Sequence, residues 1–145
     1  MRRNLNIEIA AAQASRVVDD ANERKMQAYS LSSQNRRTFM MLLIRASLED
    51  TKLLVSDLVH DLGVSRNTVE TMVKETSEAG WVHVEKDAKG HKHVWAADCL
   101  IKCYYNYSKW LYTSVKNLNL RKLTEDIARV EALYEQMEAD DFTSH

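Results

Sequence analysis

The sequence contains no proline and only three glycines in 145 residues. These two residue types interrupt helices and strands more often than any others, so their scarcity predicts long regular elements and a mainly helical chain. The glycines Gly63, Gly80 and Gly90 all lie in the middle of the sequence. We therefore expect the sharpest turns of the protein in this stretch.

Long apolar runs are also missing: the longest, residues 39–44, has six residues. A helix that crosses a bilayer needs about 20 apolar residues, so no membrane span is expected. Arg2 and Arg3 are not followed by an apolar stretch of the signal-peptide kind, which favours a cytoplasmic protein. A hydrophobic content of 45% with 28% charged residues is typical of one small globular domain.

Motifs that carry catalysis are absent as well. The sequence has no glycine-rich phosphate loop, no nucleophile elbow and no His-Glu-x-x-His motif. Acidic pairs such as Asp19-Asp20 and Asp140-Asp141 stand in segments whose pattern is that of solvated surface. We therefore expect neither an enzyme nor a bound cofactor.

The most informative stretch is residues 55–82, which predicts two short helices joined by a tight turn. Leu58, Val59 and Leu62 recur at helical spacing. Gly63 supplies a residue that tolerates a positive φ, and Ser65 is placed to cap a second helix. This pattern is that of a helix-turn-helix.

The second helix is predicted to have an apolar side and a polar side. The apolar side carries Val69, Met72, Val73 and Thr76. The polar side carries Asn67, Glu70, Thr71 and Lys74, with Arg66 in the exposed first turn. Arginine can bind guanine, asparagine can bind adenine, and a threonine methyl can pack on thymine, so this side has the chemistry to contact bases. The alternative is an ordinary solvated helix face.

After Gly80 the pattern changes to alternation, which predicts a β-hairpin. The two strands are residues 81–86 and 91–96, and the turn between them, Asp87 to Gly90, ends in glycine. Three lysines, Lys86, Lys89 and Lys92, lie near this turn and can contact phosphates. Lysines that only protect a strand edge are the alternative.

The segment from about Thr38 to Ala96 resembles the winged helix-turn-helix of MarR-type transcription regulators. The resemblance rests on Leu-Gly-Val-Ser-Arg-Asn-Thr-Val at residues 62–69 and on Asp-x-Lys-Gly-x-Lys at residues 87–92. It implies a mainly α fold with a small hairpin wing, a second helix that enters the major groove and a basic wing residue that reaches the minor groove. The roles implied by the resemblance fall on Ser65, Arg66, Asn67, Thr68 and Thr71, and on Lys89 or Lys92.

Charge adds further candidates, although the formal net charge is only −1. Residues 1–45 carry eight Lys or Arg against four acids, while residues 46–97 carry six against nine. With so few basic residues near the helix, we expect affinity to depend on base contacts and on duplication of the site in a dimer. The complete set of candidate DNA-binding residues is Arg36, Arg37, Ser65, Arg66, Asn67, Thr68, Thr71, Lys74, Lys86, Lys89 and Lys92.

The flanking segments predict dimerisation helices. Residues 4–28 and two segments after Asp98, a candidate N-cap, carry apolar residues at alternating spacings of four and three. The three stripes are Ile7, Ala11, Ala14, Val18 and Ala21; Leu100, Tyr104, Tyr107, Leu111, Val115 and Leu118; and Leu123, Ile127, Val130, Tyr134 and Met137. We expect a homodimer that binds a pseudo-palindromic site on double-stranded DNA, with an N-terminal dimerisation helix at 1–30, a winged helix at 31–97 and C-terminal dimerisation helices at 98–145.

Three other interpretations stay open. The aromatic residues between Tyr104 and Tyr112 can line a pocket for a small effector of unknown identity, or serve only in packing. Cys99 and Cys103, with His91 and His93 upstream, can form a metal or thiol sensor, or be inert. Winged helices also act as protein-docking modules without specific DNA binding, and the glutamates of the second helix favour that alternative.

Overall fold

The structure is a computed structural model that describes residues 18, 20–117 and 119–143. The chain divides into two compact units, one of residues 18–108 and one that includes residues 109–145. No helix in the described part is long and apolar enough to cross a membrane.

The first unit begins with two consecutive helices, α2 (Ala21–Ser32) and α3 (Gln34–Leu48). Asp20 caps α2 by accepting a hydrogen bond from the Glu23 backbone N–H at 2.7 Å, and Ser33 caps α3 by accepting from Arg36 at 3.1 Å. Both capping residues have extended backbone angles, so each helix begins at a defined residue.

The predicted helix over residues 4–28 needs correction at its second half. Asp20 has ψ of 123°, which is extended, and the described helix starts only at Ala21 and continues to Ser32. The aspartate side chain competes for the backbone N–H groups of the next turn and thereby starts a new helix there. Most of the predicted stripe, from Ile7 to Ala14, lies outside the described residues.

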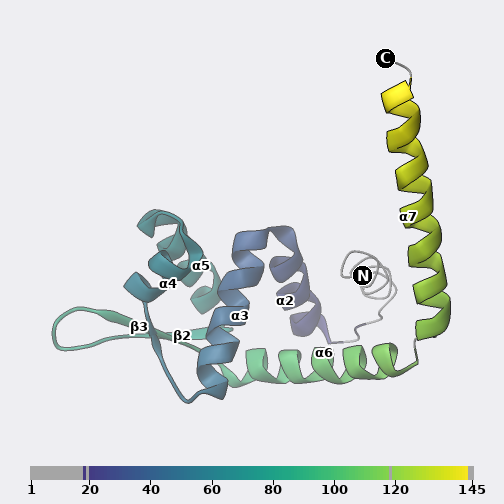
Figure 1. Cartoon of the computed structure of the whole chain (residues 1–145). Coiled ribbons are helices and arrows are strands. Elements are labelled where there is room, and N and C mark those ends of the chain that lie inside the picture. Colours follow the sequence, from purple (N-terminus) through teal and green to yellow (C-terminus); the bar gives the residue numbers. More distant parts are fainter. Residues whose placement is uncertain (1–17, 19, 118, 144–145) are drawn as a thin grey trace. The chain divides into compact units, whose positions relative to one another are not determined.

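The sheet has three antiparallel strands in the order β1-β3-β2. Strands β2 (Val82–Lys86) and β3 (Lys92–Ala96) form the predicted hairpin, and Figure 1 shows them running side by side into one loop. The two-residue strand β1 (Leu53–Leu54) pairs with β3 through Leu53 opposite Val94. Strand β1 was not predicted from the sequence.

Helices α4 (Val55–Leu62) and α5 (Arg66–Glu78) follow β1 directly. Together with α3 and the sheet they enclose a single core, in which Phe39, Leu43, Leu58, Val69 and Val94 are completely buried. Burial of such side chains is the main favourable contribution to folding. The core therefore fixes the position of α5 against the sheet and α3.

Two long helices complete the chain: α6 (Asp98–Lys116) and α7 (Leu120–Thr143). The N-terminal part of α6 joins the first unit through Leu100, which is buried in the core. Asp98, the expected N-cap, is the first residue of the helix. The fold of the first unit is a mainly α winged helix-turn-helix, as the sequence predicted.

Candidate nucleic-acid interface

The junction between α4 and α5 has the geometry of a helix-turn-helix. Gly63 ends α4 with φ of 63°, and its N–H donates to the Val59 carbonyl at 3.0 Å. Ser65 then caps α5, accepting a hydrogen bond from the Thr68 backbone N–H at 3.2 Å. Only glycine adopts this left-handed conformation at little cost, so the turn depends on Gly63.

The two sides of α5 are those expected from the sequence. Val69, Met72, Val73 and Thr76 are the buried residues of the helix. Thr76 is completely buried, and its hydroxyl donates to the Met72 carbonyl at 2.7 Å, so no polar group is left unsatisfied there. The opposite side of α5 is thereby directed away from the core.

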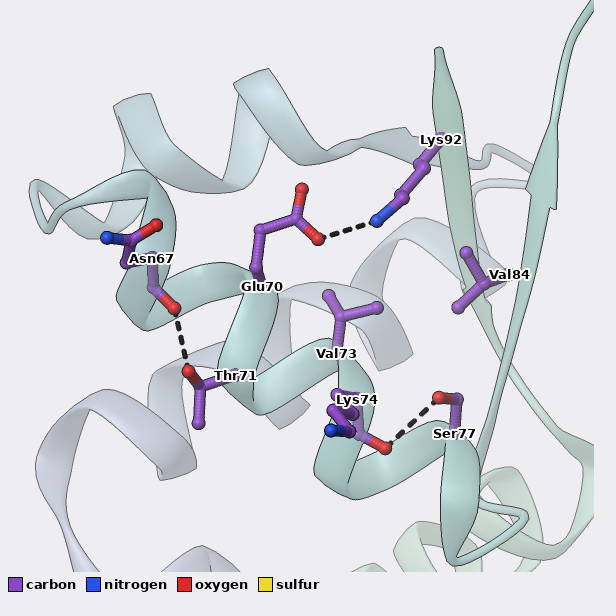
Figure 2. Close-up of a pocket in the computed structure, with 8 residues that line it drawn as sticks. All are labelled: Asn67, Glu70, Thr71, Val73, Lys74, Ser77, Val84 and Lys92. Carbon is purple, nitrogen blue, oxygen red and sulfur yellow. Dashed lines mark hydrogen bonds and ion pairs between the residues drawn. The ribbon is translucent and has the colours of Figure 1, made fainter. Parts of the chain in front are cut away.

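The outward side of α5 carries the residues predicted to contact DNA. Ser65, Arg66, Asn67, Thr68, Thr71 and Lys74 are all exposed. The Thr71 hydroxyl donates to the Asn67 carbonyl at 2.8 Å, which fixes one rotamer and leaves the threonine methyl free to make contacts (Figure 2). The exposed residues from Ser65 to Lys74 thus form a polar ridge along α5.

Two open grooves border this ridge. One, of about 480 Å³, lies between α5 and the sheet and includes Val84 and Lys92 (Figure 2). The other, of about 400 Å³, lies between α5 and the start of α3 and includes Ser33, Asn35 and Arg36. Asn67 and Thr71 line both grooves. A ridge between two grooves is a shape that fits the major groove of DNA, with phosphates on either side.

The turn of the wing is organised by Asp87. Its Oδ1 accepts hydrogen bonds from the backbone N–H groups of Lys89 and His91, both at 2.9 Å, and its Oδ2 lies 3.0 Å from Nε2 of His93. The hydrogen bond with His93, followed by that with the His91 backbone, lowers the pKa of Asp87 below its ordinary value. The ionised carboxylate therefore holds the tip of the hairpin together.

The three wing lysines have different surroundings. Lys86 and Lys89 are exposed, and neither forms an ion pair with another described residue. Lys92 is half-buried, and its Nζ lies 2.8 Å from Oε2 of Glu70 on α5. Glu70 also lies 3.6 Å from Nε of Arg66. The predicted basic cluster is thus divided between free lysines and one lysine tied to the helix.

The two candidate arginines of α3 also differ. Arg37 is exposed, whereas Nη2 of Arg36 lies 3.1 Å from Oε2 of Glu75, and its guanidinium is 4.8 Å from the centre of the Tyr29 ring. Burial raises the pKa of Tyr29 to about 12, with the Glu75 carboxylate adding to the rise and Arg36 opposing it. Arg36 therefore serves first as a contact between α3 and α5.

The alternative sensor residues do not converge in the structure. The Cys99 Sγ lies 3.4 Å from the Gly80 carbonyl oxygen, while His91 and His93 contact Asp87 at the wing turn. Among the described residues, no group of three or more His, Cys, Asp or Glu is placed to hold a metal ion.

The aromatic residues of α6 are dispersed as well. Tyr104 packs against the core of the first unit, whereas Tyr105 and Tyr112 are 62% and 69% exposed. These residues do not form one buried cluster. The interpretation as an effector pocket stays a prediction.

No protein-family model matches the sequence, and no curated protein matches it. Solved structures do match in fold. The chain is similar to MepR of Staphylococcus aureus, a transcription regulator of the multidrug efflux pump MepA, in its complex with DNA: 10% identity, 77% of this chain and 90% of that chain covered, and a TM-score of 0.56. It is also similar to the heme sensor protein PefR in complex with heme and carbon monoxide, with 14% identity, 85% and 86% covered, and a TM-score of 0.52.

A third match is HlyU from Vibrio cholerae N16961, with 15% identity, 67% of this chain and 99% of that chain covered, and a TM-score of 0.50. At this low identity the likeness establishes the fold alone. The fold is a winged helix-turn-helix of the kind that transcription regulators contain, which confirms the fold class predicted from residues 38–96.

Proposed function

We propose that the protein is a sequence-specific DNA-binding transcription regulator that acts in the cytoplasm without catalysis. The observation that carries this proposal is the exposed polar ridge of α5, from Ser65 to Lys74, bordered by grooves toward the wing and toward α3. In this arrangement α5 is the recognition helix, and the exposed lysines of the wing contact the backbone or the minor groove. The structure of MepR in complex with DNA, which has a similar fold, supports the proposal that this chain binds DNA.

Among the candidate DNA-binding residues, four cations are free to contact phosphates. Arg37, Lys74, Lys86 and Lys89 are exposed and form no ion pair within the described part of the chain, whereas Arg36 and Lys92 are paired. If two protomers each contribute four such cations, the logarithm of the affinity falls with the logarithm of salt concentration at a slope of at most about −7. Specific binding must then depend strongly on base contacts by Asn67 and Thr71.

We further propose that the protein is a homodimer, joined through α7 and the other terminal segments. Among residues 120–141 of α7 none is buried, and Val130, Leu133, Tyr134 and Met137 are each more than half exposed. Most of the stability of a helix in a protein comes from packing of its apolar face, and the apolar stripe of α7 lies exposed. A second copy of the chain offers a matching stripe.

Charge favours an antiparallel pair of α7 helices. All three basic residues of α7, Arg121, Lys122 and Arg129, lie in its first ten positions, and its last twelve positions carry four acids and no base. This layout opposes the helix dipole, which prefers acids at the start and bases at the end. Two copies that pair in opposite directions bring the basic start of one α7 beside the acidic end of the other.

Sedimentation at micromolar concentration tests the dimer, and a charge exchange tests its direction. Glu135→Lys with Glu138→Lys weakens an antiparallel pair, and adding Arg121→Glu with Lys122→Glu restores it. A parallel pair is instead strengthened by the first two substitutions, because they relieve repulsion between acids. A wild-type monomer would contradict both proposals about α7.

DNA binding itself is tested by titrating a labelled random duplex at about 50 mM salt, where phosphate contacts contribute most. We expect measurable binding that weakens as salt is raised. If the protein ignores duplex DNA and instead co-purifies with a protein partner, the protein-docking function replaces the proposed one.

A further inference from the structure

Glu70 is a carboxylate on the side of α5 that is proposed to face DNA. It lines the groove between α5 and the wing together with Asn67, Thr71 and Lys74 (Figure 2). Its side chain is 29% exposed. A negative charge at this place repels the phosphates of any duplex that approaches, so its presence needs a reason other than affinity.

The two oxygens of Glu70 hold two different cations. Oε2 lies 2.8 Å from Nζ of Lys92, which belongs to β3, and Oε1 lies 3.6 Å from Nε of Arg66, one turn earlier on α5. Figure 2 shows the Glu70 side chain extending from the helix toward Lys92 across the groove. Both cations are candidates for DNA contact, and both are engaged within the protein.

We propose that Glu70 is a specificity-determining residue that withholds Arg66 and Lys92 from duplexes of the wrong sequence. This inference rests on the proposed function of α5 as a recognition helix. When phosphates draw the two cations away, the carboxylate of Glu70 is left facing a polyanion without a partner, and binding to random DNA is weakened. The free-energy cost of the unpaired carboxylate is smaller at a site where a base edge donates a hydrogen bond to it.

Cytosine and adenine each present an amino donor in the major groove, at N4 and N6 respectively, whereas guanine and thymine present acceptors at the corresponding positions. Cytosine suits a carboxylate better, because adenine places the N7 acceptor beside its amino group and this nitrogen repels the carboxylate. At a matching site, Glu70 therefore exchanges its cations for a cytosine amino group, and Arg66 and Lys92 become available to the DNA. At other sites the exchange leaves the carboxylate unsatisfied.

The test compares Glu70→Gln with Glu78→Gln on a random duplex and on a duplex selected by the wild-type protein. Glu78 is exposed in the last turn of the same helix and forms no ion pair with a described residue, so its substitution changes the net charge equally without releasing a cation. Fluorescence anisotropy over about 50 to 200 mM salt gives the affinities and the salt slopes. Equal melting temperatures of the three proteins establish that all are folded.

We expect Glu70→Gln to bind the random duplex about tenfold more tightly, with a salt slope steeper by roughly one to two per protomer. Affinity for the selected duplex should change less, so that discrimination falls, and selection with this variant should lose its preference for cytosine at one position of each half-site. Glu78→Gln should leave discrimination unchanged.

Two results would overturn the inference. If Glu70→Gln weakens binding to both duplexes equally, the residue only supports the wing structurally. If the ratio of the affinities for the selected and the random duplex is unchanged in any other way, Glu70 has no role in discrimination. Both leave DNA binding by the wild-type protein in place. If the wild-type protein binds neither duplex, the proposed function fails and the role of Glu70 fails with it.

Discussion

Arg36 and Glu75 join the start of α3 to the third turn of α5, with Nη2 of the arginine 3.1 Å from Oε2 of the glutamate. The arginine also donates to the Ser32 hydroxyl at 2.9 Å and lies over the Tyr29 ring. These contacts hold α5 at a fixed distance from α3, on the border of one of the two grooves beside it.

Substitution of Arg36 by methionine should lower stability and change DNA binding indirectly. Both side chains of the ion pair are 36% exposed, so the pair contributes about 0.5–1 kcal/mol. Arg37→Met removes the same charge from an exposed neighbour and should leave the free energy of unfolding unchanged while weakening DNA binding. Urea unfolding measures the difference; equal stability of the two variants would remove the structural role of Arg36.

Substitution of Asn67 by alanine should affect specific DNA binding only. Asn67 lies on the exposed ridge and lines both grooves, so its removal takes away a base contact without disturbing the core. We expect a loss of about 1–3 kcal/mol on the selected duplex and little change on a random one. Competition binding with both duplexes measures this, and an equal loss on both would place Asn67 at the DNA backbone instead.

Substitution of Lys89 by glutamine should weaken binding to all sequences alike. Lys89 stands in the wing turn, which Asp87 organises, and its side chain is exposed. Losing one phosphate contact should make the salt slope shallower by about one per protomer. A salt titration on the random duplex provides the value. Lys86→Gln is the companion variant. If neither substitution changes the salt slope, Lys86 and Lys89 do not contact DNA.

Tyr29 should make the stability of the protein sensitive to alkaline pH. Its folded pKa of about 12 lies above the ordinary value of 10.0. The folded state therefore keeps this proton more firmly than the unfolded state, so the contribution of Tyr29 is complete below pH 10 and is lost as pH rises toward 12. The sign follows because deprotonation between these values favours unfolding.

The corresponding variant is Tyr29→Phe, which keeps the ring beneath Arg36 and removes the ionisable group. The other five tyrosines are common to both proteins, so they cancel in the comparison. Unfolding in urea at about pH 9 and about pH 11 should show a larger loss for the wild-type protein. If the wild-type protein and Tyr29→Phe lose the same free energy of unfolding between these two pH values, the fold does not protect the Tyr29 hydroxyl from deprotonation.

The local parts of the fold were predictable from sequence because short-range chemistry determines them. The positive φ of Gly63, the cap at Ser65 and the buried side of α5 each depend on residues within one or two turns. The hairpin from Val82 to Ala96 followed from alternation and from a glycine-ended turn. A helix-turn-helix and a wing are both defined by such local patterns.

What the sequence did not predict depends on distant residues. Strand β1 has two residues, too few for a periodic pattern, and exists because Leu53 pairs with Val94. The ion pairs Glu70 with Lys92 and Arg36 with Glu75 join residues 22 and 39 positions apart. The sequence pattern identified Glu70, Lys92 and Arg36 as polar surface residues, yet only the packed structure shows which charges neutralise one another.

The central claim, that the ridge from Ser65 to Lys74 binds a specific duplex, is tested most directly by selecting bound fragments from random DNA. The wild-type protein should enrich a sequence with two inverted half-sites about one helical turn apart. A variant carrying both Asn67→Ala and Thr71→Ala should enrich none. Recovery of unenriched random fragments by the wild-type protein, or of the same sequence by the double variant, would contradict the claim.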